Sequence, residues 1–227
     1  MRARSGQATK ILVMKWSAMG DLALATTVIE DIHNEFPDAT IDLDTPPRFA
    51  SLFAHDPRFR RVLAIDTRRV GGVGLIQWLR RVASERYDAI IDLQSTDRSR
   101  LLISALLLLG RAPLFRIGNH RRWPYNVAPP VQLSNVHAVE HLRATIRACG
   151  IVPTCSHPVL HAADAHHARV QELLTRYALQ SGNYALFMPG CQAAGQGQGW
   201  VGAEHSHRCS TLICQSEFQR CRRSPGS

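Results

Sequence analysis

The sequence predicts an α/β fold built on a Rossmann-like, doubly wound parallel sheet. Short apolar runs that contain β-branched residues alternate with runs of helical period through most of the chain. This alternation is typical of parallel strands joined by crossover helices. The composition agrees, because 45% of the 227 residues are hydrophobic and can fill a sizeable core.

The first half of the chain supplies four of the expected strands. The opening strand, residues 11–14, stops at a Ser-Ala-Met-Gly turn, and a helical pattern begins at Leu22. A Phe-Pro-Asp stop at 36–38 precedes the second strand. The elements from there on are a strand at 39–44, a short helix at 49–53, a strand at 62–66, a helix at 75–86 and a strand at 87–93.

The same pattern continues up to residue 190. The run 101–109 is apolar on all sides, so we expect a buried helix there. The remaining expected elements are a strand at 115–118, helices at 136–149 and 163–177, and a strand at 184–190 that is placed to open a second α/β domain.

These patterns divide the chain into four segments. Residues 1–10 form a basic leader that we expect to be disordered, and residues 11–180 form the main domain. Residues 181–190 hold the first strand of a further domain. After Gly190 the periodicity ends, and we expect residues 191–227 to form an aperiodic, disordered tail.

The net charge of +9 at pH 7 favours anionic partners. It rests almost wholly on arginine, because Lys10 and Lys15 are the only lysines, and the planar arginine fork suits phosphate and carboxylate groups. A nucleotide, an acidic sugar, an anionic membrane surface and nucleic acid remain open on composition alone. Nucleic acid is disfavoured, since no recognised motif is present and the aromatic residues are few and scattered.

The chain is predicted to be cytoplasmic. Its most apolar run, residues 101–109, is far shorter than the roughly 20 residues that span a bilayer, and no signal-peptide core follows the basic start. We therefore expect the six cysteines to be thiols. No metal site is expected, because the histidines and cysteines of the tail fit no common zinc spacing (His205, His207, Cys209, Cys214 and Cys221).

Asp21 is the candidate site residue that the local pattern singles out. It follows a buried strand and a tight turn, and it lies at the start of a helix. In an open parallel sheet, ligands bind in the crevice beyond the carboxyl ends of the strands. A carboxylate also stabilises a helix start, so Asp21 has both a capping and a ligand-facing interpretation.

Arginines and one histidine–glutamate pair are the other candidates. Arginines cluster at 58–69 and 116–122, with Arg98 and Arg100 beyond the fourth strand, and form either a solvated face or a cationic bay for an anionic substrate. His137 and Glu140 share one helix face. They fit either a structural pair that bridges to a loop or the placement of an acid/base or substrate group.

Six short motifs, taken in order, resemble glycosyltransferase family 9, the ADP-heptose:lipopolysaccharide heptosyltransferases. The resemblance covers about residues 10–190 and rests on the order and separation of the motifs. They are Ile11-Leu12-Val13 with Ser17-Ala18-Met19-Gly20-Asp21, Phe36-Pro37-Asp38-Ala39, Tyr87-Asp88-Ala89-Ile90-Ile91-Asp92-Leu93-Gln94, Arg116-Ile117-Gly118, His137-Ala138-Val139-Glu140 and Tyr184-Ala185-Leu186-Phe187-Met188-Pro189-Gly190.

The resemblance implies the GT-B arrangement, in which two Rossmann-like domains face each other across a cleft. Residues 11–180 would be the acceptor-binding domain, and residues 181–190 the first strand of a truncated, largely missing donor domain. Asp21 would be the general base that takes the proton of an acceptor hydroxyl as this oxygen attacks the anomeric carbon with inversion. The acceptor-binding residues would be Ser17, Gly20, Arg98, Arg121, Arg122, His137, Glu140 and Arg143, with Ser17 and Gly20 shaping the turn.

The implied reaction transfers heptose from ADP-heptose to the lipopolysaccharide inner core, without a metal or cofactor, at the inner face of the cytoplasmic membrane. The chain departs from the family at His141, where an arginine is usual, and after Gly190, where the donor-site motif has no counterpart. This loss of pattern suggests a shifted reading frame after about residue 191, so we expect the chain to be inactive alone. The alternative is a non-catalytic module that binds an anionic glycan or a partner chain.

Overall fold

The structure is a computed structural model that describes residues 9–67, 72–131, 133–180, 184, 186–187 and 212–213. The chain divides into two compact units, residues 1–162 and 163–227. The five-stranded sheet lies in the first unit, which therefore carries most of the predicted fold.

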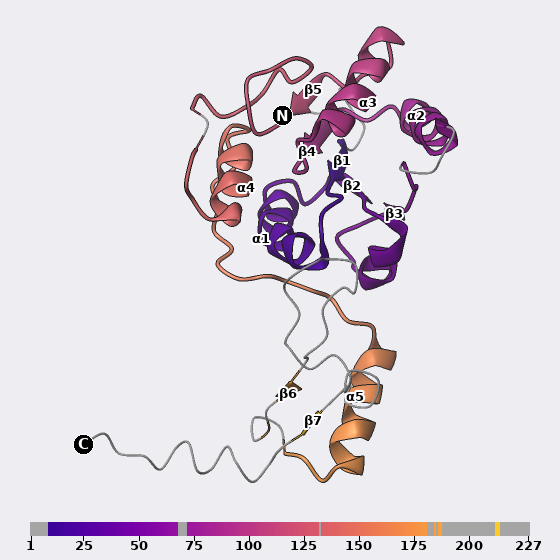
Figure 1. Ribbon diagram of the computed structural model, residues 1–227, viewed down its shortest axis with the longest axis vertical. Helices are drawn as coiled ribbons and strands as arrows, with labels where there is room; N and C mark the ends of the chain where they lie inside the picture. The colour runs from indigo at the N-terminus through magenta and orange to yellow at the C-terminus, as the bar shows by residue number, and fades with distance from the viewer. Residues whose placement is uncertain are drawn as a thin grey trace, which may run out of the picture. The chain divides into compact units, whose positions relative to one another are not determined.

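Strands and helices alternate through the first unit, as the sequence predicts (Figure 1). The strands are β1 (Lys10–Met14), β2 (Thr40–Asp44), β3 (Arg61–Leu63), β4 (Ala89–Asp92) and β5 (Phe115–Ile117). The helices are α1 (Met19–Glu35), the 3₁₀ helix η1 (Pro47–Phe53), α2 (Val73–Glu85), α3 (Asp97–Leu108) and α4 (Ala138–Arg147).

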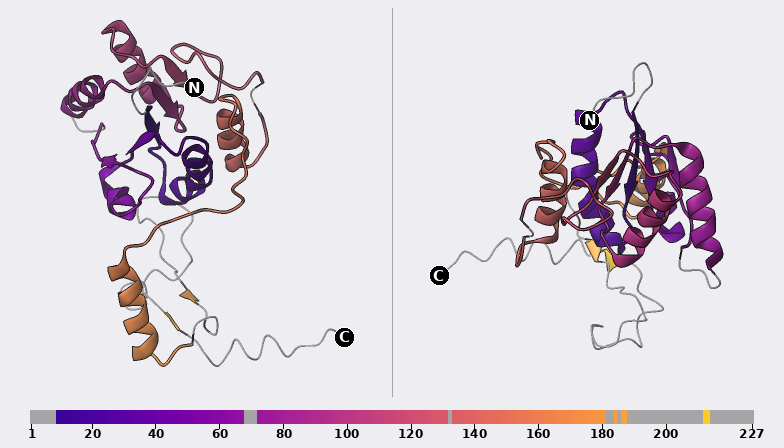
Figure 2. Two further views of the ribbon diagram at one scale, coloured as in Figure 1. Left: turned by 180° about the vertical axis from the view of Figure 1, so that it is seen from behind. Right: turned by 90° about the horizontal axis from the view of Figure 1, so that it is seen from above.

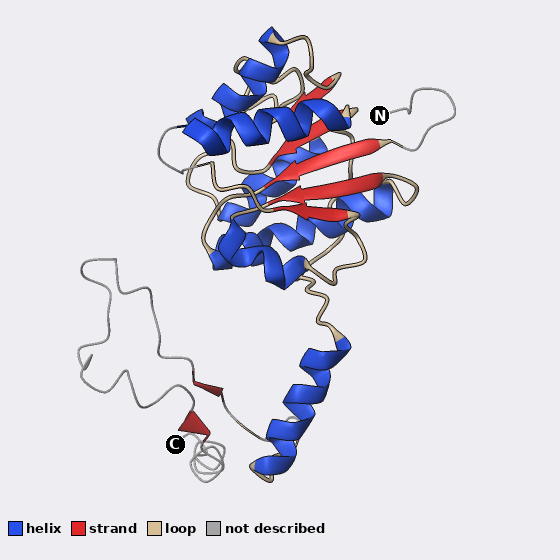
Figure 3. Cartoon of the chain, turned by 90° about the vertical axis from the view of Figure 1, so that its right-hand side faces the viewer, coloured by secondary structure: helices blue, strands red, loops and turns tan. Residues whose placement is uncertain are grey.

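The sheet has the strand order β3-β2-β1-β4-β5, and every neighbouring pair is parallel. All five strands consequently end at the same edge of the sheet (Figure 3). The order reverses between β1 and β4, which makes this point the topological switch. The predicted Rossmann-like, doubly wound parallel sheet is confirmed.

Helices cover both faces of the sheet, with α1 and α4 on one side and α2 and α3 on the other (Figure 2). The alternation of side chains along a strand explains the two cores. Ile11 and Val13 of β1 pack with residues of α1 and α4, whereas Leu12 and Met14 pack with residues of α2 and α3. Burial on both faces is why the sequence of β1 reads as a continuous apolar run.

The prediction that the run 101–109 forms a helix buried on all sides is wrong in part. Helix α3 is longer and begins at Asp97, because Thr96 and Ser99 form a capping box. Leu101 is 63% exposed and Leu108 is 82% exposed. Only one side of α3 contacts the sheet, where Leu102, Ile103 and Leu106 are buried, so its outer leucines face away from the core.

The predicted leader covers residues 1–10, but its last residue belongs to the sheet. Lys10 belongs to β1, and its backbone N–H donates to the carboxylate of Asp88 at 3.0 Å. The backbone N–H of Thr40 donates to the carbonyl of Thr9 at 2.8 Å, so the pairing reaches Thr9. Residues 1–8 of the leader lie outside the described residues.

The second unit contains α5 (Asp164–Arg176) and an antiparallel pair, β6 (Leu186–Phe187) with β7 (Leu212–Ile213). The structure thus divides the chain after Ala162, whereas the sequence placed the boundary at residue 180. The physical reason is that α5, although amphipathic in sequence, has no buried residue. The rest of the tail, including its histidines and cysteines, lies outside the described residues. Among the described helices, none combines the length and apolar character required to cross a bilayer.

Asp31 attaches α1 to the segment that follows α4. Its Oδ1 accepts hydrogen bonds from the backbone N–H of Thr154 at 2.9 Å, the hydroxyl of Thr154 at 2.8 Å and the backbone N–H of Cys155 at 2.9 Å. Asp31→Ala should lower the free energy of unfolding by about 2 kcal/mol, since three donors lose a charged acceptor. Urea denaturation measures this loss, and Asp38→Ala, at an exposed site, is the control. Equal losses in both variants would contradict the anchoring role.

Candidate functional site

The candidate site lies at the carboxyl edge of the sheet, where the segments after β1 and β4 meet. The backbone N–H of Trp16 and the hydroxyl of Ser17 both donate to Oε1 of Gln94, at 3.0 and 2.7 Å. The ammonium of Lys15 donates to the carbonyl of Leu93 at 3.2 Å. These bonds hold the two segments together across the topological switch, where open α/β sheets bind their ligands.

Asp92, the last residue of β4, holds the segment that follows this strand in place. Its Oδ1 accepts from the backbone N–H groups of Gln94 at 2.9 Å and Ser95 at 2.7 Å, and its Oδ2 accepts from the hydroxyl of Tyr125. Burial raises the pKa of Asp92 against these hydrogen bonds. The hydroxyl of Ser95 accepts in turn from the backbone N–H of Asn119 at 3.2 Å, which joins the segment after β5 to the same edge.

Asp21 lies in the first turn of α1, and its side chain is exposed. The N-cap position belongs to Ala18, which provides no capping side chain, so Asp21 acts on the helix only as a negative charge near its amino end. Burial lowers the pKa of Lys15, and the negative charges of Asp21 and Asp92 oppose this effect. The Asp21 carboxylate therefore lies at the switch point, near the buried Lys15, and is accessible to a ligand.

Gly20 and Ser17 were expected to shape the turn. Gly20 lies within the first turn of α1, and a β-carbon at this position would meet no atom within 4 Å. Packing against the rest of the chain therefore does not require glycine here. Ser17 does hold the turn, through its hydrogen bond to Gln94.

The arginines expected at the acceptor site divide into two groups. Arg98 lies exposed in the first turn of α3, and Arg121 and Arg122 lie exposed after β5. No carboxylate among the described residues pairs with these three guanidinium groups, which leaves them available to an anion. They follow β4 and β5 and so belong to the same edge as Asp21.

His137, Glu140 and Arg143 are bound within the chain instead. His137 is the N-cap of α4, and its side chain accepts from the backbone N–H of Val139 at 3.3 Å. Arg143 donates to Glu140 at 2.7 Å and to the carbonyl of Cys155 at 3.0 Å. The bond from Arg143 lowers the pKa of Glu140. Arg143 thus links Glu140 to the loop that contains Cys155, while His137 caps α4. A role of the His137–Glu140 pair in acid/base chemistry or substrate placement stays a prediction.

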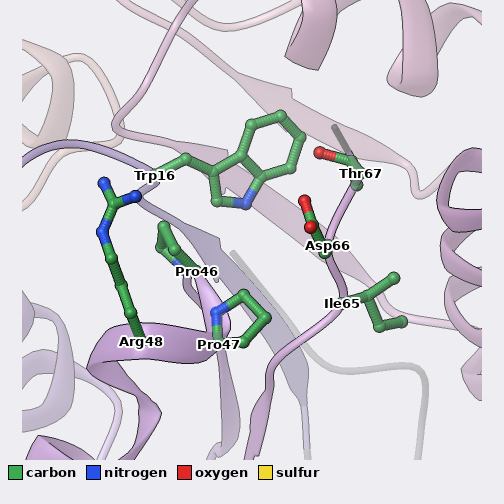
Figure 4. A pocket seen from close by; sticks show the side chains of 7 residues that line it. All are labelled: Trp16, Pro46, Pro47, Arg48, Ile65, Asp66 and Thr67. Carbon is green, nitrogen blue, oxygen red and sulfur yellow. The ribbon is translucent and has the colours of Figure 1, made fainter. Parts of the chain in front are cut away.

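A pocket of about 220 Å³ lies at the carboxyl edge of the sheet, formed by residues that follow β1, β2 and β3. We call it the Trp16 pocket (Figure 4); it is lined by Trp16, Pro46, Pro47, Arg48, Ile65, Asp66 and Thr67. Sequence reasoning missed it, together with Lys15 and Gln94. The signal was present, because every lining residue lies in the segment that follows a strand or in the first turn of η1.

The parallel strand order, with its switch point between β1 and β4 at the carboxyl edge of the sheet, defines a Rossmann-like α/β unit of the kind that binds ligands at this place. Among solved structures, a family 9 glycosyltransferase from Veillonella parvula matches with a TM-score of 0.62 and 17% identity, over 77% of this chain and 51% of that one. The E. coli heptosyltransferase WaaC with ADP-2-deoxy-2-fluoro heptose matches with a TM-score of 0.58 and 22% identity, over 81% and 60%. The E. coli ADP-heptose lps heptosyltransferase II matches with a TM-score of 0.55 and 19% identity, over 77% of this chain and 52% of that one.

No protein-family model and no curated protein matches the chain by sequence. The structural matches show that the chain shares the Rossmann-like α/β fold of part of these glycosyltransferases. It spans between about half and three-fifths of the length of these three structures.

Proposed function

We propose that the first unit binds the glycan acceptor of a sugar-transfer reaction and that Asp21 is its general base. The observation that carries this proposal is the exposed carboxylate of Asp21 at the switch point between β1 and β4. Ligands of open α/β sheets bind at this place. A positioned carboxylate there can accept a proton from a bound hydroxyl.

The proposed reaction transfers heptose from ADP-heptose to the lipopolysaccharide inner core with inversion. The acceptor hydroxyl gives its proton to Asp21, and its oxygen forms a bond to the anomeric carbon. The bond from this carbon to the diphosphate breaks, and ADP leaves with the electron pair. The ADP-heptose analogue in the WaaC structure supports this choice of donor. The required chemistry uses no metal or cofactor.

The unpaired arginines support an anionic acceptor. Arg98, Arg121 and Arg122 lie exposed in the segments that follow β4 and β5 and can pair with phosphates or acidic sugars of the inner core. The same charges favour contact with an anionic membrane surface, in keeping with a cytoplasmic protein that works at the inner face of the membrane.

The experiment separates catalysis from binding alone. Isothermal titration measures binding of an inner-core oligosaccharide. ADP release from ADP-heptose is then followed in two arms. The first arm contains the chain alone, and the second also contains the donor-binding half of a family 9 glycosyltransferase as a second polypeptide. Transfer that depends on Asp21 in either arm supports the proposal. Binding without transfer in both arms supports the non-catalytic alternative, and the absence of binding contradicts both.

A further inference from the structure

The outer side of α3 is an apolar face that the described part of the chain leaves exposed. Leu101, Leu108 and Leu109 are 63, 82 and 62% exposed. Together with Ala105 they follow one another at intervals of three or four residues, so they share one side of the helix. We call these four residues the α3 leucine face. Large apolar side chains that gather on a surface mark a contact with a membrane or a partner.

Trp123 lies near the start of the same helix. The guanidinium of Arg100, in the first turn of α3, donates to the backbone carbonyl of Trp123 at 3.3 Å. Trp123 itself is 57% exposed. Tryptophan is enriched where a protein meets the headgroup level of a bilayer, because its ring is apolar and its N–H is polar. The opposite end of α3 projects from the first unit (Figure 1).

The segment from α3 to the loop after β5 is strongly cationic. Residues 97–122 contain six arginines and one carboxylate, Asp97. Arg100 pairs with Asp97 at 3.0 Å, and Arg116 donates to the carbonyls of Pro113 and Pro124, both at 2.8 Å. The other four arginines are exposed and pair with no carboxylate of the described residues: Arg98, Arg111, Arg121 and Arg122. An apolar face with a cationic border suits anionic lipid headgroups.

These charges disfavour a second copy of the chain on the α3 leucine face. In a symmetric antiparallel pair of α3 helices, Arg98 at the start of one helix would lie against the end of the other, which Arg111 follows. Asp97 is the one carboxylate of this segment, and Arg100 already pairs with it. Like charges would therefore meet without compensation, whereas an anionic bilayer neutralises them.

We propose that the α3 leucine face docks the first unit on a bilayer that contains anionic lipids. The leucines enter the boundary of the acyl chains, roughly 5–10 Å deep, and the exposed arginines pair with lipid phosphates. A helix of 12 residues is too short to cross a bilayer, so α3 lies along the surface. The inference rests on the proposed function for its membrane setting, and it names the surface that makes the contact.

The direction of α3 fits an acceptor that is attached to a lipid. The helix begins after the carboxyl end of β4 and leads back toward the start of β5, over about 18 Å. Its first turn therefore belongs to the edge that carries Asp21. A bilayer that contacts the side of α3 borders this edge, as a lipid-linked acceptor requires.

Vesicle flotation of the full chain tests the docking. Vesicles of phosphatidylglycerol with phosphatidylcholine are compared with vesicles of phosphatidylcholine alone, at low and at high salt. The chain should float with the anionic vesicles at low salt and lose most of this binding at high salt, which screens the arginines. Brominated acyl chains should quench the tryptophan emission of the bound chain, and Trp123→Phe should lack most of this quenching.

Matched variants locate the contact on α3. Leu108→Ser should weaken the affinity for the anionic vesicles about tenfold, since one leucine no longer leaves water. Leu160→Ser, at an exposed leucine of the same unit, should retain the affinity of the unmodified chain. Arg111→Gln, outside the proposed acceptor site, should weaken the affinity about fivefold. Arg48→Gln removes an equal charge from the exposed side of η1 and should have no effect.

The outcomes separate this inference from the proposed function. Equal losses in Leu108→Ser and Leu160→Ser, or no flotation with anionic vesicles at low salt, would overturn the docking surface. A dimer in sedimentation velocity that Leu108→Ser dissociates, without flotation, would assign the face to a second copy and overturn it too. Transfer to a soluble inner-core oligosaccharide needs no vesicle, so transfer that depends on Asp21 leaves the proposed function intact in either case. Flotation without any acceptor binding overturns the proposed function alone.

Discussion

Asp21→Asn should lower the rate of sugar transfer in the two-polypeptide system by about 10²–10⁴-fold. The amide has nearly the size of the carboxylate but cannot accept the proton of the acceptor hydroxyl. Because Asp21 is exposed, the free energy of unfolding should change by no more than about 0.5 kcal/mol. The rate of ADP release at saturating acceptor measures the effect on the chemical step.

A matched variant on the same helix controls for the lost charge. Glu35→Gln removes one exposed carboxylate from the carboxyl end of α1, far along the helix from the switch point, and should retain the rate of the unmodified chain. Acceptor affinity should stay within about twofold in both variants, since general-base catalysis acts on the transition state. Full transfer by Asp21→Asn would show that another group takes the proton.

Asp44→Asn should remove a pH dependence of stability that the buried Asp44 carboxyl produces. Asp44 ends β2 and is completely buried, with its Oδ2 accepting from the indole N–H of Trp78 at 2.5 Å. Its Oδ1 has no hydrogen-bond partner among the described residues. Burial raises the pKa of Asp44 to about 7, against the hydrogen bonds from Trp78 and Trp16.

The direction of the effect follows from the raised pKa. In the unfolded chain the carboxyl ionises near its ordinary value of 3.8, whereas in the folded chain it keeps its proton up to about pH 7. The contribution to stability is therefore fully present below pH 3.8 and is lost as the pH rises through 7. The difference between the two pKa values corresponds to a total loss of about 4 kcal/mol.

Urea denaturation between pH 5.5 and 8.5 measures this loss. Over this range the unmodified chain should lose about 2 kcal/mol more unfolding free energy than Asp44→Asn, which keeps only the pH dependence of the other groups, Asp92 among them. Asp38→Asn, at an exposed position, should show the slope of the unmodified chain. Stability that rises with pH in the unmodified chain but not in Asp44→Asn would contradict the raised pKa.

Most of the sheet could be predicted from the sequence, because burial on both faces leaves a strong apolar signal. The strands at 39–44 and 87–93 lie within a few residues of β2 and β4. The start of α3 could not be predicted from hydrophobicity, since it depends on the polar capping box of Thr96 and Ser99. The exposure of Leu101 depends on which elements cover α3, and the hydrophobic periodicity of the sequence does not indicate which elements these are.

The candidate site was predictable in position but not in detail. Asp21 could be placed at a sheet edge because the turn after β1 is local in sequence. The bond between Ser17 and Gln94 joins residues from two strands, and only the strand order brings them together. The bond from Arg143 to the carbonyl of Cys155 depends in the same way on the path of the loop after α4, whereas the Arg143–Glu140 pair is local to the helix.

Chemical-shift mapping of the full chain with an inner-core oligosaccharide tests the central claim most directly, because it requires no donor. The backbone amide signals of Gly20, Asp21, Gln94, Ser95 and Asn119, which all lie at the carboxyl edge, should shift at saturation. Shifts confined to Arg86, Arg111 and Leu114, which line a pocket at the amino edge, would contradict the account.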